Sequence, residues 1–237
     1  MHIVLILSFG AYLFALFIRP LLFLGILLQS GYILWRASEL ERLPLVGPHD
    51  TMVFLAASIA AFALPFCSKI KNSRVFHNLI VVSAALLTVL ALIYEPRNIP
   101  LPPVLKTFWF ETHVVLAFMS YALFGVASVL GYVYLKDNEA MTEGLQYRAI
   151  LIAYCLFTLS MIFGGIWAYL AWGNYWLWTP KELWTSILWI FYSFYLHARL
   201  RQWWTGRPAA ILGIAGFGVV MFTYLGVSLL MKSSHSF

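Results

Sequence analysis

Aromatic side chains crowd into residues 172–184, which read Trp-Gly-Asn-Tyr-Trp-Leu-Trp-Thr-Pro-Lys-Glu-Leu-Trp. Tryptophan and tyrosine anchor proteins at membrane–water boundaries, so a plain interfacial belt is one interpretation. Gly173 and Pro180 are expected to interrupt a helix here, because glycine suits helix ends and proline lacks the backbone donor. The break predicts an aromatic shelf suited to the face of a large planar apolar ligand. Its four indole rings belong to Trp172, Trp176, Trp178 and Trp184.

Two of the six histidines are predicted on the same side of the membrane as this tryptophan loop. His113 follows a Phe-Trp-Phe-Glu run at the start of an apolar segment, and His235 lies shortly after the last apolar segment. Two neutral imidazoles on opposite faces of a tetrapyrrole can ligate its iron. The residue types therefore indicate a haem site formed by His113, His235 and the loop, with unrelated interfacial histidines as the alternative.

The other histidines are expected elsewhere. His197 lies thirteen residues beyond the last tryptophan of the loop, which is about 20 Å along a helix axis, so it cannot ligate the same iron. It is a second candidate ligand near the inner surface, or a residue solvated beside Arg199. His77 is on the right side to meet His197, but we expect it to be a solvated helix end. His2 and His49 are expected on the surface.

The elements that must position these residues are membrane helices. The chain has 237 residues, of which 62% are hydrophobic and only 10% are charged, too apolar for one soluble core. A crossing needs about 17–25 mostly apolar residues, and the pattern predicts an all-α, polytopic membrane helix bundle in a single domain, 1–237. The eight predicted crossings are 2–18, 20–36, 51–67, 77–94, 112–135, 149–171, 184–199 and 209–230. Arg19-Pro20 predicts a tight turn between the first two, with one long kinked helix as the alternative.

Basic residues predict the orientation. With eight crossings both termini lie on one side, and placing them outside puts nine of the fifteen Lys and Arg residues in inner loops. These nine are Arg19, Lys69, Lys71, Arg74, Lys136, Arg148, Arg199, Arg201 and Arg207. The net charge of +6 is scattered over short loops, so no nucleic-acid partner is expected. The first segment has no cleavage pattern and is expected to be retained.

The two cysteines form no Cys-x-x-Cys pair. Cys67 and Cys155 are far apart in sequence, and both lie in apolar stretches. We expect them to be small buried hydrophobic residues, which argues against thiol-disulfide exchange by this chain.

At these residues the sequence resembles the CcsA (ResC) family of system II cytochrome c assembly, within the haem-handling superfamily that includes CcmC and CcmF. The loop is similar to the Trp-Gly-x-x-Trp-x-Trp-Asp signature of that superfamily, with Thr179 in place of the aspartate. Threonine can still cap the following helix, and Pro180 suits its first position. Further similarity lies at Tyr195-Leu196-His197-Ala198-Arg199, at Tyr224-Leu225-Gly226-Val227 with His235-Ser236-Phe237, at His113 followed by Ser120-Tyr121-Ala122, and at Pro44-Leu45.

The resemblance implies a membrane component of cytochrome c assembly, and a subunit of a cytochrome c synthase. It implies haem b as the substrate, received or translocated and presented on the outer face for thioether attachment to apocytochrome c. It also implies a CcsB (ResB)-type partner that supplies a second inner histidine, and a bacterial plasma membrane or a thylakoid-type membrane. The main alternative is a HemX-type regulatory or scaffolding protein, for which His113 and His235 would be dispensable. A small-solute transporter would need charged or discontinuous helices at mid-membrane, which the sequence does not suggest.

Overall fold

The computed structural model describes residues 2–70, 73–96, 98 and 100–230. Within these ranges the chain is helical, with short connections and no strand, which confirms the predicted all-α class. The chain divides into two compact units, Met1–Pro100 and Leu101–Phe237. The expectation of a single membrane domain concerns how these units combine, and it stays a prediction.

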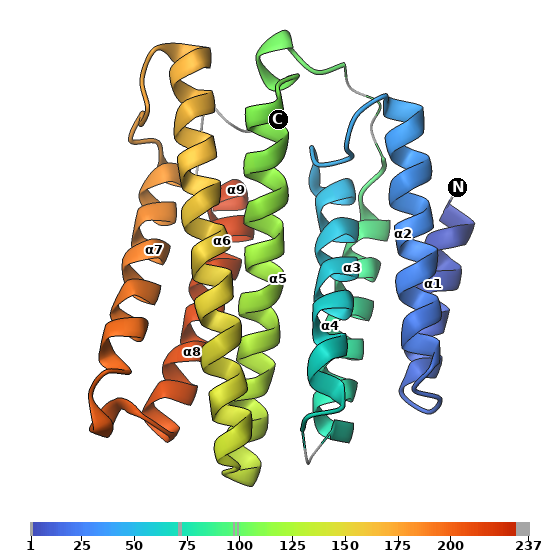
Figure 1. The fold of residues 1–237 in the computed structure, drawn as a ribbon. Coiled ribbons are helices and arrows are strands. Elements are labelled where there is room, and N and C mark those ends of the chain that lie inside the picture. The colour runs from blue at the N-terminus through green and yellow to red at the C-terminus, as the bar shows by residue number, and fades with distance from the viewer. Residues whose placement is uncertain (1, 71–72, 97, 99, 231–237) are drawn as a thin grey trace. The chain divides into compact units, whose positions relative to one another are not determined.

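Among its described residues, the first unit has four helices: α1 (His2–Ala15), α2 (Leu21–Leu40), α3 (Pro48–Cys67) and α4 (Ser73–Ile93) (Figure 1). They form a ring in which each helix packs against the next and α4 closes onto α1. The chain reverses between Ala15 and Leu21, at the predicted Arg19-Pro20 turn. The turn is therefore confirmed, and the kinked single helix is not what forms.

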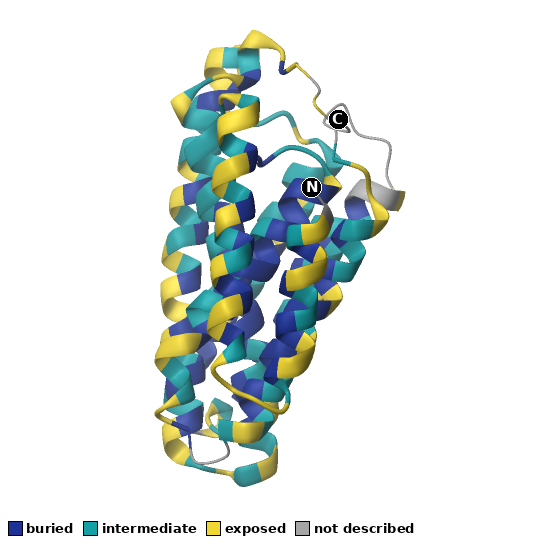
Figure 2. Ribbon diagram, turned by 90° about the vertical axis from the view of Figure 1, so that its right-hand side faces the viewer, coloured by how far each residue is buried: buried dark blue, intermediate teal, exposed yellow. Residues whose placement is uncertain are grey.

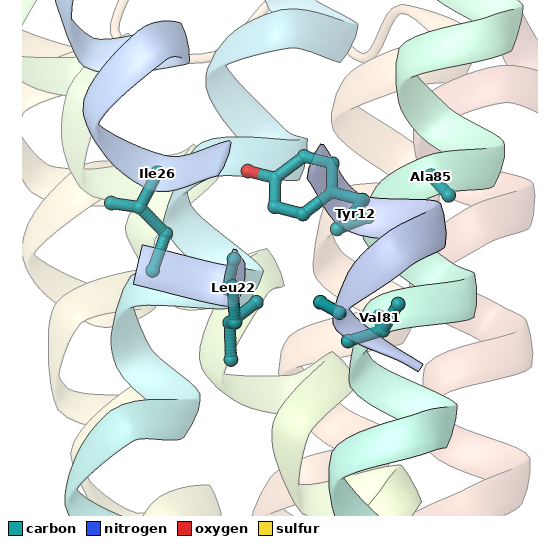
Figure 3. Packing of buried hydrophobic residues seen from close by; sticks show 8 residues of the cluster. Tyr12, Leu22, Ile26, Val81 and Ala85 are labelled. Atoms are coloured by element: carbon teal, nitrogen blue, oxygen red, sulfur yellow. The ribbon is translucent and has the colours of Figure 1, made fainter. Parts of the chain in front are cut away.

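The core of this unit centres on Tyr12, whose ring lies between α1 and its neighbours (Figure 3). A β-carbon added at Gly25 would lie 2.4 Å from that ring, so the glycine permits the close approach of α2 to α1. The Tyr12 hydroxyl donates to Gln29 Oε1 at 2.6 Å, and Gln29 Nε2 donates to Thr88 Oγ1 at 2.8 Å. This buried polar chain joins three helices where apolar contacts alone would give little specificity.

Two histidines of the first unit lie inside it, against expectation. His49 is 2% exposed, and its Nε2 is 2.7 Å from the Tyr32 hydroxyl while its Nδ1 is 2.9 Å from the Ala91 carbonyl oxygen. His77 is 4% exposed, and its Nε2 is 2.9 Å from the Ala15 carbonyl oxygen. The predictions of a surface His49 and a solvated His77 are wrong, because each ring completes the hydrogen bonding of a neighbouring helix end.

A buried ionic cluster lies at one end of the same unit. The side chain of Arg36 is fully buried, and its Nε donates to Asp50 Oδ1 at 3.4 Å. Its guanidinium also bonds Glu39 Oε2 at 3.2 Å and the Asn98 side-chain oxygen, while Asn98 Nδ2 donates to Glu39 Oε1 at 3.3 Å. The cluster thus ties the end of α2 to the start of α3 and to the segment that follows α4.

The second unit is also a helical ring. It contains α5 (Phe108–Asp137), α6 (Ala140–Trp172), α7 (Pro180–Ala198) and α8 (Arg207–Met221), and α8 continues through a π-helical turn (Phe222–Gly226) into α9 (Val227–Leu230). α5 packs along α6 and α8, and α7 packs on α6 and α8. With 30 and 33 residues, α5 and α6 are about 45 and 50 Å long, longer than the roughly 30 Å hydrocarbon core.

In the part of the chain that the structure describes, six helices are long and apolar enough to span a membrane: α2, α3, α4, α5, α6, and α8 with its π-helical turn. α1 is shorter than a full crossing, and α7 is not among the six, so their crossings stay predictions. Exposed residues lie along the helices (Figure 2). They include large apolar ones, such as Leu34 of α2 and Phe108 of α5, each 70% exposed. Lipid accounts for such faces, since water would make them costly.

The cysteines differ from expectation in burial. Cys67 is half-buried, with its thiol donating to the Ala63 carbonyl oxygen at 3.4 Å, whereas Cys155 is exposed on α6. The prediction of two buried residues is wrong, because α6 presents part of its apolar surface outward rather than to the bundle.

Candidate functional site: a histidine seat and a tryptophan loop

The tryptophan loop is a true break between two helices. α6 ends at Trp172, and Gly173 takes the left-handed conformation at φ +74° that ends many helices. α7 begins at Pro180 after Thr179. The predicted interruption at Gly173 and Pro180 is therefore what forms.

Thr179 caps the start of α7, as expected. Its side chain accepts from the Glu182 backbone N–H at 3.4 Å, while Glu182 Oε2 accepts from the Thr179 backbone N–H at 2.8 Å. This reciprocal capping box satisfies two backbone donors at the start of α7. The replacement of the expected aspartate by threonine therefore preserves the local fold.

Glu182 also holds the loop in shape, a role that the sequence reading missed. Its Oε2 accepts from the Leu177 backbone N–H at 3.0 Å as well as from the Thr179 backbone N–H. One carboxylate oxygen thus bonds the backbone amides of the residues on either side of Trp178. Trp178 itself lies at φ +57°, where a bulky residue is strained, and the residue is 73% exposed. The carboxylate thus supports a conformation that turns an indole ring outward.

The four tryptophans are not equivalent. Trp172 and Trp178 are exposed, and Trp172 also makes an edge contact with Trp167 at 4.7 Å between ring centroids. Trp176 and Trp184 are half-buried, and the Trp184 ring packs at 4.4 Å on Phe222 of the π-helical turn. In this loop, therefore, two indoles are exposed and two are half-buried.

His113 packs against Ser160 and Gly164 of α6, which together we call the histidine seat. Its Nδ1 is 2.7 Å from the Ser160 carbonyl oxygen, and Ser160 Oγ donates to the His113 carbonyl oxygen at 2.8 Å. A β-carbon added at Gly164 would lie 2.6 Å from Nδ1, so the imidazole occupies space that only glycine leaves open. Since a carbonyl oxygen can only accept, Nδ1 carries the proton and Nε2 carries the ring lone pair. This is the tautomer suited to metal ligation through Nε2.

The glycine next to the seat contacts the tryptophan loop. A β-carbon added at Gly165 would meet the Tyr175 backbone oxygen at 3.6 Å, an ordinary van der Waals distance. Adjacent residues of α6 therefore pack against His113 and against the loop. The tertiary structure brings these two predicted parts of the site together.

His197 lies at the far end of α7 from the loop. It is exposed, and its Nδ1 is 2.7 Å from the Ser193 carbonyl oxygen of its own helix. The same argument assigns the proton to Nδ1 and the lone pair to Nε2. His113 and His197 lie at opposite ends of the unit, as the sequence predicts. His235 lies outside the described residues, so its pairing with His113 stays a prediction.

Lys181 places positive charge beside the loop. It is half-buried in the first turn of α7, before the predicted crossing 184–199, and burial lowers the pKa of its ammonium group. An anionic group next to this ammonium would favour its charged form.

Loss of the Glu182 carboxylate is expected to loosen the loop. Glu182→Ala removes the shared acceptor of two backbone amides, at a cost of about 1–3 kcal/mol, and Trp178 should relax out of its left-handed conformation. The half-buried Trp176 and Trp184 should become more accessible as the loop loosens, so tryptophan fluorescence of the purified protein should show greater quenching by a soluble quencher. Glu182→Gln keeps an acceptor oxygen, so its quenching should fall between that of the wild type and that of Glu182→Ala. Glu111→Ala, which removes a first-turn carboxylate from α5, is the matched control, and equal quenching in the two alanine variants would contradict this role.

Comparisons with known proteins identify a family for this chain. A family profile described as Cytochrome C assembly protein matches residues 46–235. The Cytochrome c biogenesis protein CcsA of Chlamydomonas reinhardtii is 30% identical over 239 residues, covering 92% of this chain and 68% of that protein. CcsA of Prochlorococcus marinus (strain MIT 9312) is 30% identical over 251 residues, covering 89% of this chain and 81% of that protein.

A solved structure shares the fold. The Cytochrome c Heme Lyase CcmF superposes with a TM-score of 0.68 at 17% identity, covering 94% of this chain. The chain spans only 46% of the length of that structure, and at this identity the likeness concerns the fold alone. The family profile and the CcsA relatives cover most of the sequence, and on that ground the chain belongs to the CcsA family of cytochrome c assembly proteins.

Proposed function

We propose that this chain receives haem as a substrate at the outer end of its second unit and presents it for attachment to apocytochrome c. His113 supplies one axial ligand through Nε2, and His235 supplies the other. The exposed indoles of Trp172 and Trp178 contact the porphyrin, while Lys181 offers positive charge to its propionates. The observation that carries the proposal is the packing of His113 and the tryptophan loop against adjacent glycines of α6.

The arrangement suits a site that holds haem without reacting with it. The Ser160 carbonyl keeps Nδ1 protonated, which orients the imidazole and raises the basicity of Nε2. The attachment itself is an addition, in which each substrate thiol forms an S–C bond with a vinyl group and its proton moves to the other vinyl carbon. No oxidant is consumed, so this chain needs only to bind, orient and release haem.

His197 is proposed as a ligand of a second, inner site. Its exposed imidazole carries the lone pair on Nε2, and a second histidine would come from a CcsB-type partner. Such a site would receive haem b on its way to the outer face. In this proposal the termini lie on the outer side of a bacterial plasma membrane or a thylakoid-type membrane.

The absorption spectrum of the purified protein tests the proposal. Protein from haem-replete cells, prepared with its CcsB-type partner, should carry haem with the split α and β bands of low-spin bis-histidine ligation. The His197→Ala variant should lower the total haem recovered while the remaining haem keeps that spectrum, because it loses the inner site only. Colourless wild-type protein would overturn the proposal and favour a HemX-type regulatory role.

A further inference from the structure

We propose that Ser160 and Gly164 of α6 are positioning residues that set how well His113 can ligate haem. The inference rests on the proposed function, because it concerns the same ligand. It goes further in assigning control of that ligand to a helix that contributes none of the predicted iron ligands. The geometry that points to it is a three-sided seat made by one turn of α6.

Ser160 forms the first two sides of the seat. Its carbonyl oxygen lies 2.7 Å from His113 Nδ1, and its hydroxyl lies 3.1 Å from the same nitrogen and 2.8 Å from the His113 carbonyl oxygen. Ser160 is 1% exposed, so water cannot replace these bonds. The imidazole is therefore held by both its ring and its backbone.

Gly164 forms the third side, one helical turn further along α6. A β-carbon at this position would lie 2.6 Å from Nδ1, 2.8 Å from Cε1 and 3.2 Å from Cγ. Those contacts lie on the ring itself and not on a flexible chain end, so the ring would have to move. Such a movement would lengthen the bond from Nδ1 to the Ser160 carbonyl oxygen and turn Nε2 away from its present direction.

A second serine link joins the same two helices. Ser120, seven residues after His113, donates from Oγ to the Ala153 carbonyl oxygen at 2.8 Å, and Ala153 lies seven residues before Ser160. The two serine links therefore share one antiparallel register of α5 and α6. Removing one leaves the other in place, which makes Ser120 the matched control for Ser160.

The experiment compares four variants of the full chain, purified with its CcsB-type partner. Gly164→Ala should weaken haem binding about ten- to a hundredfold, the range expected when the support of a metal ligand is lost. Ser160→Ala keeps the carbonyl and should weaken binding less. Gly144→Ala and Ser120→Ala should match the wild type, because the first adds a methyl group to α6 in open space and the second alters a link two turns away.

A haem-free readout separates this inference from the proposed function. In haem-free protein, the imidazole NMR signals of His113 should report the Nδ1-protonated tautomer in the wild type, in Gly144→Ala and in Ser120→Ala, and a change of tautomer or environment in Gly164→Ala. A wild-type signal in Gly164→Ala, or equal haem loss in Ser160→Ala and Ser120→Ala, would overturn the positioning role. If His113→Gly kept the wild-type haem spectrum, the proposed ligand would be wrong, whatever the tautomer signals showed.

Discussion

Cytochrome c assembly is expected to fall sharply in the His113→Gly variant and to recover when imidazole is added. The substitution removes the proposed outer ligand and leaves a space of imidazole size beside Ser160 and Gly164, where the free base can bind the same iron position. Covalent haem on a reporter cytochrome should fall at least about tenfold, the low end of what weakened support of a metal ligand costs. The measurement is haem staining of that reporter with and without imidazole.

The control for this experiment is the neighbouring residue. Val114→Gly puts the same helix-weakening glycine into α5 at a cost of about 1 kcal/mol, but removes no ligand. It should retain assembly, or lose some without response to imidazole. His235→Gly is expected to behave as His113→Gly does. Full assembly in a variant that carries both His113→Gly and His235→Gly, without added imidazole, would eliminate the outer bis-histidine site and favour the HemX-type alternative.

Removal of Arg36 is expected to give the largest loss of stability in the first unit. Arg36→Met leaves the buried Asp50 carboxylate, 4% exposed, without the guanidinium that now bonds it. Breaking a buried ion pair from one side costs about 3–5 kcal/mol. The thermal unfolding temperature of the purified protein in detergent, followed by helical circular dichroism, should fall markedly.

Two further variants test whether the unpaired charge is the cause. Arg19→Met makes the same change at an exposed arginine of the α1–α2 turn and should leave the unfolding temperature nearly unchanged. Arg36→Met combined with Asp50→Leu removes both charges and should recover most of the loss, because apolar packing can replace a buried pair. A double variant as unstable as Arg36→Met alone would show that the guanidinium acts through packing instead.

The sequence by itself determined the helices and most of their limits. Long apolar runs admit only helices in a membrane, because every backbone donor must be satisfied within its own segment. The breaks at Arg19-Pro20, at Gly173 and at Pro180 follow from backbone chemistry that is local to those residues. The same locality explains why the capping by Thr179 could be foreseen.

The tertiary structure alone decided what surrounds each histidine. His49 and His77 looked like surface residues from their neighbours in sequence, yet both are buried, because their partners come from helices far along the chain. The Gly164-Gly165 pair could have suggested a close helix contact, but nothing in its sequence names His113 as the neighbour.

The seat of His113 depends on the register between α5 and α6, which a single sequence does not contain. Shifting that register by one residue would turn the Ser160 carbonyl and the Gly164 gap away from the imidazole, since neighbouring helical residues point about 100° apart. Residue type therefore predicted which side chains could bind haem iron. The packing of one helix on another places the Ser160 carbonyl oxygen against Nδ1 of His113, which favours the proton there and leaves Nε2 for the proposed haem iron.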